Sequence, residues 1–206
     1  TTAVSPGTFV MHASGRYGIE ILRPLTDQGC LPLALHPVMT FTGTSIDLNR
    51  LSACPFGITT VQTLRPVAET LVVEIGGEPI WVPEENRGLY HAALTFGANN
   101  LMTLVTQTTE LLEAAGITNP EHLVAPLLGA SLDNALRNGD AAITGPVARG
   151  DAGTVREHLR VLANFDPAVS QAYRAMARLT AIRALASGTL QPHLAEELLI
   201  VLADES

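Results

Sequence analysis

Short apolar runs alternate with turn-forming residues in the first part of the chain, up to about residue 83. Four runs have the length and composition of buried strands, and one segment near 62–75 has helical spacing. Strands that alternate with helices are typical of a parallel α/β sheet. The predicted strands occupy residues 8–13, 31–35, 56–60 and 79–82.

After Pro83 the apolar positions recur with helical spacing to the end of the chain. A long helix is predicted over 84–115, where Pro83 and two glutamates open it and Gly116 closes it. We therefore expect two domains, an α/β domain over 1–83 and an all-α domain over 84–206. The further predicted helices occupy 120–138, 151–164, 167–186 and 192–203.

Composition and charge restrict the possible partners. The chain has 206 residues, is 47% hydrophobic and carries a formal net charge of −8. A large core is therefore expected, and neither nucleic acid nor a membrane surface is an expected partner, because both require clustered positive charge. All basic residues are arginines, which excludes mechanisms that use a lysine amine.

The two cysteines, Cys30 and Cys54, are interpreted as small core residues. With no secretory signal at the first residues, they indicate a reducing compartment and a cytoplasmic location. No apolar run has the roughly 18 to 20 residues that a membrane-spanning helix needs.

Glycine spacing does not supply a dinucleotide-binding loop. The G-x-G-x-x-G pattern is absent, and the segment Gly145–Gly150 is followed by Asp151 where a phosphate loop requires lysine. We expect this chain alone to bind a dinucleotide poorly.

Two predicted strands end in histidine. His12 and Ser14 share one face of an extended strand, and Gly15 allows the backbone to approach a ligand closely. A strand-end histidine and serine that cap a loop remain the alternative. His36 is more specific, because Pro37 holds it in an extended conformation at a strand end, where an imidazole can exchange the hydroxyl proton that accompanies hydride transfer.

A polar stripe lies along the predicted long helix. His91, Thr95 and Asn99 follow one another at four-residue spacing, with Asn100 on the flank. The stripe either faces a substrate or forms hydrogen bonds between helices.

The segment 144–151 is predicted to be a rigid break between helices, with Asp151 as the cap of the helix that follows. Arg149 is either an anion-binding group at the substrate cleft or a solvated side chain in a turn. No metal ligand set is assigned.

Four runs resemble the DUF2520 group of Rossmann-like proteins, which is related to the 6-phosphogluconate-dehydrogenase-like and pyrroline-carboxylate-reductase-like NAD(P)-dependent oxidoreductases. The resemblance covers nearly the whole chain and implies the C-terminal part of a Rossmann-like parallel sheet followed by a helical domain that forms a homodimer. It also implies that the chain begins partway through the cofactor-binding domain. The runs are His12–Gly15, His36–Gly43, Leu89–Asn100 and Thr144–Asp151.

Partial matches suggest roles for individual residues. In prephenate dehydrogenases, which the His36 run resembles, the residues that match Ser14 and His36 contact the reacting hydroxyl. The helix with His91 is similar to that of ketopantoate reductases, in which lysine and asparagine stand at the positions of His91 and Thr95. This departure places lysine-dependent chemistry in doubt and leaves His91 as a substitute acid or a substrate ligand.

The resulting hypothesis is an NAD(P)-dependent oxidoreductase that acts on a small, anionic hydroxy or oxo compound. The expected catalytic residues are Ser14, His36, His91 and Asn99, and the expected cofactor-binding residues, next to NAD or NADP in the full-length protein, are His12, Ser14 and Gly15. Thr95, Asn100 and Arg149 are the expected substrate-binding residues. The competing hypothesis is a noncatalytic dimerisation or ligand-sensing module, and a G-x-G-x-x-G motif upstream of Thr1 would favour the enzyme.

Overall fold

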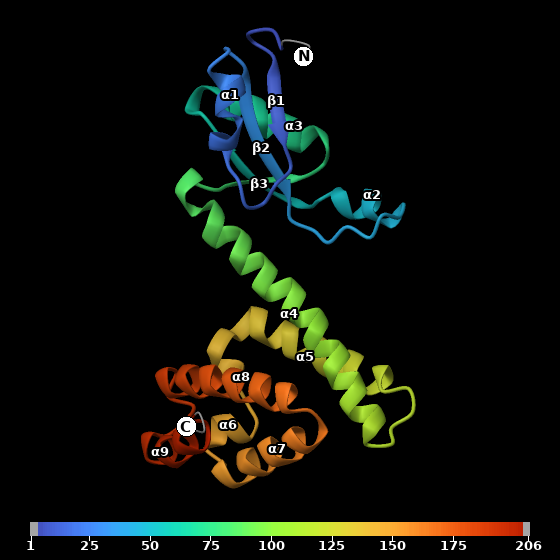
Figure 1. Cartoon of the computed structure of the whole chain (residues 1–206), viewed down its shortest axis with the longest axis vertical. Helices are drawn as coiled ribbons and strands as arrows, with labels where there is room; N and C mark the ends of the chain where they lie inside the picture. The colour runs from blue at the N-terminus through green and yellow to red at the C-terminus, as the bar shows by residue number, and fades with distance from the viewer. Residues whose placement is uncertain (1–3, 204–206) are drawn as a thin grey trace. The chain divides into compact units, whose positions relative to one another are not determined.

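A computed structural model of the chain describes residues 4–203 (Figure 1). The chain forms two compact units, Thr1–Met102 and Thr103–Ser206, and the boundary between them falls inside one long helix. The first unit contains the sheet and the second is entirely helical among the residues described. The predicted fold class, α/β followed by all-α, is therefore confirmed.

The first unit is built on a four-stranded sheet in which neighbouring strands follow the chain order. β1 pairs with β2 in parallel and β3 pairs with β4 in parallel, but β2 and β3 are antiparallel. The expectation of a purely parallel sheet is thus wrong at one pair. The connection between β2 and β3, residues 38–54, contains the short helix α2 (Ile46–Leu51) and leads β3 back along β2 in the opposite direction. The strands are β1 (Phe9–His12), β2 (Leu31–Pro37), β3 (Pro55–Thr60) and β4 (Glu78–Trp81).

The alternation of side chains along β2 separates a core face from a site face. Leu33 and Leu35 pack with Ile58 of β3 against Val72 of α3, and all four are buried. Ala34 and His36 point to the opposite face. The helical segments of this unit are η1 (Ile19–Leu22), α1 (Arg23–Thr26), η2 (Gln62–Leu64), α3 (Arg65–Glu74) and η3 (Glu84–Asn86).

The predicted long helix is confirmed as α4 (Arg87–Ala114), which is preceded by η3. Its end is followed by Gly116, whose φ of +86° is the left-handed conformation that a helix end favours. No described helix combines the length and the apolar character needed to cross a membrane.

The second unit confirms the remaining predicted helices and adds a short one, α6, inside the predicted break. Asp151 caps α7 as expected, because its carboxylate accepts hydrogen bonds from the backbone N–H and the hydroxyl of Thr154. The elements are α5 (Glu121–Asn138), η4 (Gly139–Ala142), α6 (Pro146–Arg149), α7 (Ala152–Phe165), α8 (Pro167–Ala186) and α9 (Pro192–Val201).

The core of this unit lies among α7, α8 and α9. Leu198 of α9 is fully buried against Val155 of α7 and Ala181 of α8, and the small alanine side chain allows close packing of the helices. Ile200, two residues along α9 from Leu198, is 69% exposed.

Truncation of Leu198 should therefore destabilise the second unit strongly. We expect Leu198→Ala to lower the free energy of unfolding by about 2–5 kcal/mol, because it removes buried methyl groups and leaves a cavity. Urea denaturation followed by circular dichroism measures this, and Ile200→Ala on the same helix is the matched control, with an expected change of about 0.5 kcal/mol or less. Equal effects of the two substitutions would contradict the packing described above.

Candidate active site

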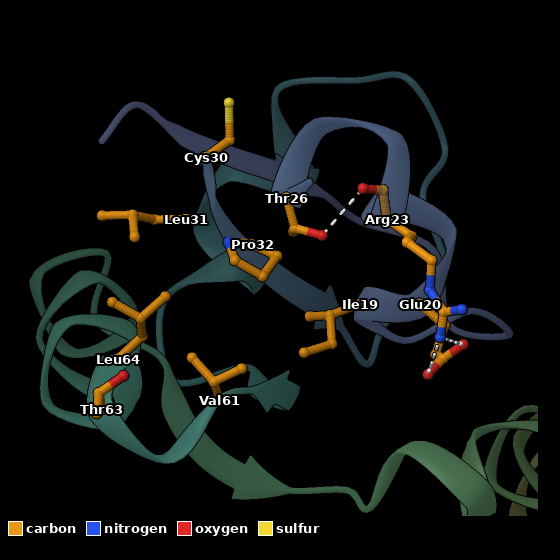
Figure 2. A pocket seen from close by; sticks show the side chains of 10 residues that line it. All are labelled: Ile19, Glu20, Arg23, Thr26, Cys30, Leu31, Pro32, Val61, Thr63 and Leu64. Carbon is orange, nitrogen blue, oxygen red and sulfur yellow. Dashed lines mark hydrogen bonds and ion pairs between the residues drawn. The ribbon is translucent and has the colours of Figure 1, made fainter. Parts of the chain in front are cut away.

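A cavity of about 330 Å³ lies at the amino end of β2 (Figure 2). Its lining is mostly apolar, and the Arg23 guanidinium at its edge forms an ion pair with Glu20. None of the residues expected from the sequence to form a site lines this cavity, so the candidate site lies elsewhere. The lining residues are Ile19, Glu20, Arg23, Thr26, Cys30, Leu31, Pro32, Val61, Thr63 and Leu64.

His36 lies near the opposite, carboxyl end of β2 and is partly buried. Its Nδ1 atom is 2.8 Å from the Tyr90 hydroxyl, and the two rings meet edge to face at 88° with centroids 5.6 Å apart. Strand β2 thus sets the position of the imidazole, and Tyr90 on the first turn of α4 holds its orientation.

Gly57 of β3 makes room for this contact. It is the register partner of His36 in the antiparallel pair. A Cβ atom at Gly57 would overlap the Tyr90 hydroxyl and would lie 2.7 Å from its Cζ atom. Only a glycine at this strand position allows the Tyr90 ring to pack this close to β3.

Gly15 brings two histidines together beyond the end of β1. A Cβ atom at this buried glycine would lie 2.9 Å from Cε1 and Nε2 of His36 and 2.8 Å from Cδ2 of His91. The two imidazoles therefore border the same stretch of backbone. Of the residues predicted from the sequence, the structure groups Gly15, His36 and His91 most directly.

Arg87, the first residue of α4, forms hydrogen bonds with the turn after β1, with β2 and with β3. It is only 2% exposed, and its Nη2 donates to the carbonyl oxygens of Ala34 and Gly57 at 3.1 and 2.9 Å. Its Nε donates to the Thr59 hydroxyl at 2.7 Å, and Nη1 donates to the Ser14 carbonyl at 3.4 Å. The guanidinium carbon also lies 5.6 Å from the centre of the Tyr90 ring.

Burial and neighbouring basic groups favour the neutral form of His36. Burial of the ring lowers the pKa of His36, and electrostatic interactions with Arg87 and His91 lower this pKa further. Burial also lowers the pKa of Arg87, but a guanidinium remains charged in proteins. At neutral pH His36 is thus an uncharged imidazole that can exchange a proton beside a fixed cation.

His12 and Ser14 shape the turn after β1. His12 Nδ1 accepts the Ser14 backbone N–H at 3.2 Å, and its Nε2 donates to the Gly18 carbonyl at 2.8 Å. The Ser14 hydroxyl in turn accepts the Tyr17 backbone N–H at 3.4 Å. Both polar groups of the His12 ring are therefore engaged with the backbone, and a cofactor-binding role for His12 and Ser14 stays a prediction.

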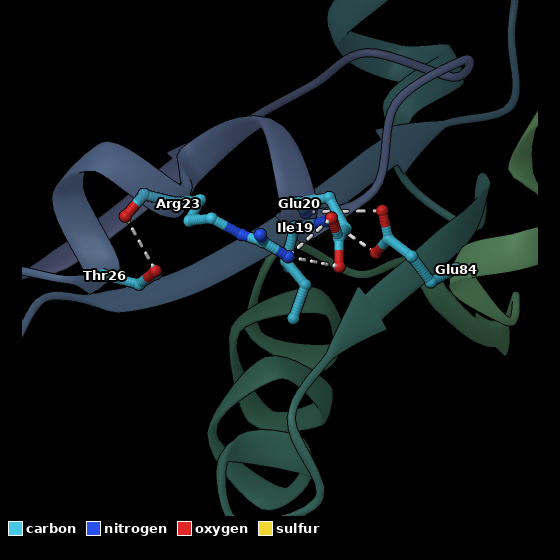
Figure 3. A network of polar contacts seen from close by, with 5 residues as sticks. All are labelled: Ile19, Glu20, Arg23, Thr26 and Glu84. Carbon is cyan, nitrogen blue, oxygen red and sulfur yellow. Dashed lines mark hydrogen bonds and ion pairs between the residues drawn. The ribbon is translucent and has the colours of Figure 1, made fainter.

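Glu84 connects this turn to the start of α4. Its carboxylate accepts the backbone N–H groups of Ile19 at 2.7 Å and Glu20 at 3.3 Å (Figure 3). The contact spans more than sixty positions of the sequence and holds the segment after Gly15 near the residues that carry Arg87 and Tyr90.

The remaining predicted residues lie further away along the chain. Thr95 is partly buried on α4, and Asn99 and Asn100 are exposed one turn later. Arg149 is exposed at the end of α6 in the second unit. Their proposed roles stay predictions.

Three residues of the site were not predicted from the sequence: Arg87, Tyr90 and Gly57. Arg87 and Tyr90 are three residues apart and His91 follows at once, so helical spacing places all three near one face of the first turns of α4. This spacing could have identified Arg87 and Tyr90 from the sequence. No neighbouring residue distinguishes Gly57, because its role depends on Tyr90, which lies far along the chain.

A side chain at Gly15 should displace the histidines. We expect Gly15→Ala to change the imidazole NMR signals of His36 and His91, because the new methyl group needs space that both rings occupy. Heteronuclear NMR of the histidine side chains measures this in the folded protein. Gly97→Ala on α4 is the control: a Cβ there meets nothing within 4 Å, so it should leave these signals unchanged and stabilise the helix by about 0.5–1 kcal/mol. Unchanged signals in Gly15→Ala would contradict the arrangement.

Comparisons with solved structures support the fold. Protein TM1727 from Thermotoga maritima superimposes with a TM-score of 0.70 at 23% identity, over 86% of this chain and 69% of that one. The protein named "putative NADP oxidoreductase BF3122" from Bacteroides fragilis superimposes with a TM-score of 0.69 at 22% identity, over 84% of this chain and 64% of that one. This chain therefore spans only about two thirds of the length of these proteins. At this level of identity the likeness concerns the fold alone.

A search of curated proteins finds no match. The sequence profile of a Rossmann-like domain matches residues 1–37. The profile of DUF2520, a domain of unknown function, matches residues 54–180, which is more than half of the chain. The chain belongs to the DUF2520 family.

Proposed function

We propose that the intact protein is an NAD(P)-dependent oxidoreductase that transfers hydride to or from a small anionic hydroxy or oxo compound. The observation that carries this proposal is the neutral His36 at the carboxyl end of β2, held by Tyr90 and set against the bare backbone of Gly15. In Rossmann-like sheets the ligand crevice lies at the carboxyl ends of the strands.

The imidazoles of His36 and His91 are the groups that a nicotinamide would meet at this site. They cover the buried Gly15, where even a Cβ atom would lie within 2.9 Å of both rings, so the cofactor ring would lie beside the imidazoles and not on the glycine backbone. When bound, the nicotinamide would supply or accept the hydride. The 206 residues contain no G-x-G-x-x-G loop for the pyrophosphate, so the proposal requires the pyrophosphate to be held by residues other than these.

The positive charge around His36 supports an anionic substrate. Arg87 is a permanent buried cation, and the Glu84 carboxylate, which accepts two backbone N–H groups, also interacts with it electrostatically. A substrate carboxylate would be attracted by this charge, and Ser14, His91 and Asn99 would orient it, with Thr95 and Asn100 as further contacts. His36 would give or take the proton at the reacting oxygen.

The second candidate function is a noncatalytic dimerisation or ligand-sensing module. Exposed apolar side chains in the second unit favour self-association, and they include Leu127 at 63% and Leu136 at 80% exposure on α5. Homodimerisation through the helical part is compatible with either function.

Nucleotide binding distinguishes the two functions. We expect the full-length gene product to bind NADPH or NADH in calorimetry and to oxidise the bound nucleotide with members of a panel of small oxo acids. His36→Ala should lower turnover by about 10²- to 10⁴-fold with little change in nucleotide affinity, whereas His158→Ala, in a similar histidine–tyrosine pair of the second unit, should change neither. If neither nucleotide binds, the oxidoreductase proposal is wrong.

The oligomeric state is a separate prediction. The chain should sediment as a dimer at micromolar concentration, and Leu136→Asp should shift it toward the monomer because a charge would be buried in the interface. Leu48→Asp, at a 73% exposed position of α2, is the control. A monomeric wild-type chain would contradict this prediction.

A further inference from the structure

The chain contains two histidine–tyrosine pairs of nearly the same geometry. His36 Nδ1 lies 2.8 Å from the Tyr90 hydroxyl, and His158 Nδ1 lies 2.9 Å from the Tyr173 hydroxyl. Both pairs of rings meet edge to face, with centroids 5.6 and 5.7 Å apart. Ring geometry alone therefore does not distinguish the candidate site from a pair elsewhere in the fold.

The charges around the two pairs are opposite in sign. His36 interacts with the positive charge of Arg87, whereas the carboxylates of Asp151 and Glu157 interact with His158. The guanidinium of Arg87 lies over the ring of Tyr90. The first pair is thus a neutral imidazole next to a phenol that faces a cation.

A neutral imidazole carries its proton on one nitrogen, and the partner of the other nitrogen decides which. Nδ1 of His36 faces the Tyr90 oxygen, while Nε2 faces the backbone at Gly15. The hydroxyl of Tyr90 can donate to Nδ1 or accept from it. A positive charge next to a phenol draws electron density from its oxygen and makes its O–H a stronger donor and a weaker acceptor. Arg87, whose guanidinium carbon lies 5.6 Å from the centre of the Tyr90 ring, therefore favours the first arrangement.

We propose that Tyr90 is a positioning residue that donates its O–H to Nδ1 of His36 and so fixes the neutral tautomer with the proton on Nε2, beside Gly15. Arg87 orients the phenol, and the glycine at position 57 allows the phenol to reach His36. The proposal concerns residues of one compact unit only.

This tautomer narrows the substrate class, an inference that rests on the proposed function. An Nε2–H group donates a hydrogen bond to the oxygen of an oxo compound without any prior proton shift. A hydroxy compound must instead lose its proton to a nitrogen with a free lone pair, which Nε2 lacks in this form. When hydride reaches the carbonyl carbon, Nε2 would pass its proton to the substrate oxygen while Nδ1 takes the proton of the Tyr90 hydroxyl, which leaves a phenolate beside Arg87. The resting site is therefore set to bind the oxo form of the substrate.

The test is nitrogen NMR of the histidine side chains in the ¹⁵N-labelled chain. The wild-type protein should show His36 in the Nε2–H tautomer at a pH above its pKa. Tyr90→Phe should produce a mixture of tautomers and raise the pKa of His36 by up to about one unit, because the lost hydrogen bond stabilised the neutral form. Tyr173→Phe is the matched control and should change the signals of His158 while those of His36 stay the same.

Opposite results would overturn the proposal. A wild-type His36 with its proton on Nδ1 means that Tyr90 accepts the hydrogen bond, and Tyr90→Phe would then lower the pKa of His36, because the lost bond stabilised the protonated form as well. The wild-type spectrum decides the tautomer even if Tyr90→Phe does not fold. Since no cofactor or substrate is added, a failure here is distinct from a failure to bind NADPH or NADH.

Discussion

The buried guanidinium of Arg87 is the interaction on which the candidate site depends. Charge is costly to remove from water, and this guanidinium is 2% exposed with backbone carbonyls and one hydroxyl as its hydrogen-bond partners. Those partners come from the turn after β1, from β2 and from β3, so a single side chain connects three segments that are distant in the sequence. Burial of the ring lowers the pKa of His36, and the charge of Arg87 lowers this pKa further. The same side chain therefore supports the fold and contributes to the electrostatics of the site.

Most of the fold followed from local patterns. The helices of the second unit begin and end close to the proline, aspartate and glycine positions that mark them, because capping depends on neighbouring residues. The antiparallel direction of β3 could not be predicted from the sequence pattern. It depends on the path of the connection from β2 and not on the residues of the strand itself. Apolar periodicity is the same for parallel and antiparallel neighbours when both faces of the sheet are covered.

The sequence predicted those residues of the site that follow apolar runs or belong to the polar stripe of the long helix. His36 and Gly15 were identified from their places after apolar runs, and His91 from the helical stripe; the structure brings these three together. Arg87 was missed because arginine at the first turn of a helix is usually solvated, and only the tertiary fold shows that it is buried. Tyr90 and Gly57 were missed for the same reason: each acquires its role from a residue on another element.

Gly57 offers a way to sort the members of the DUF2520 family. A homologue with any side chain at this strand position could not keep its tyrosine in contact with the histidine, even if both residues were present in its sequence. The glycine on β3 is thus a better marker of a shared histidine–tyrosine contact than the histidine alone. Proteins without this glycine would be expected to arrange the two rings differently on the same fold.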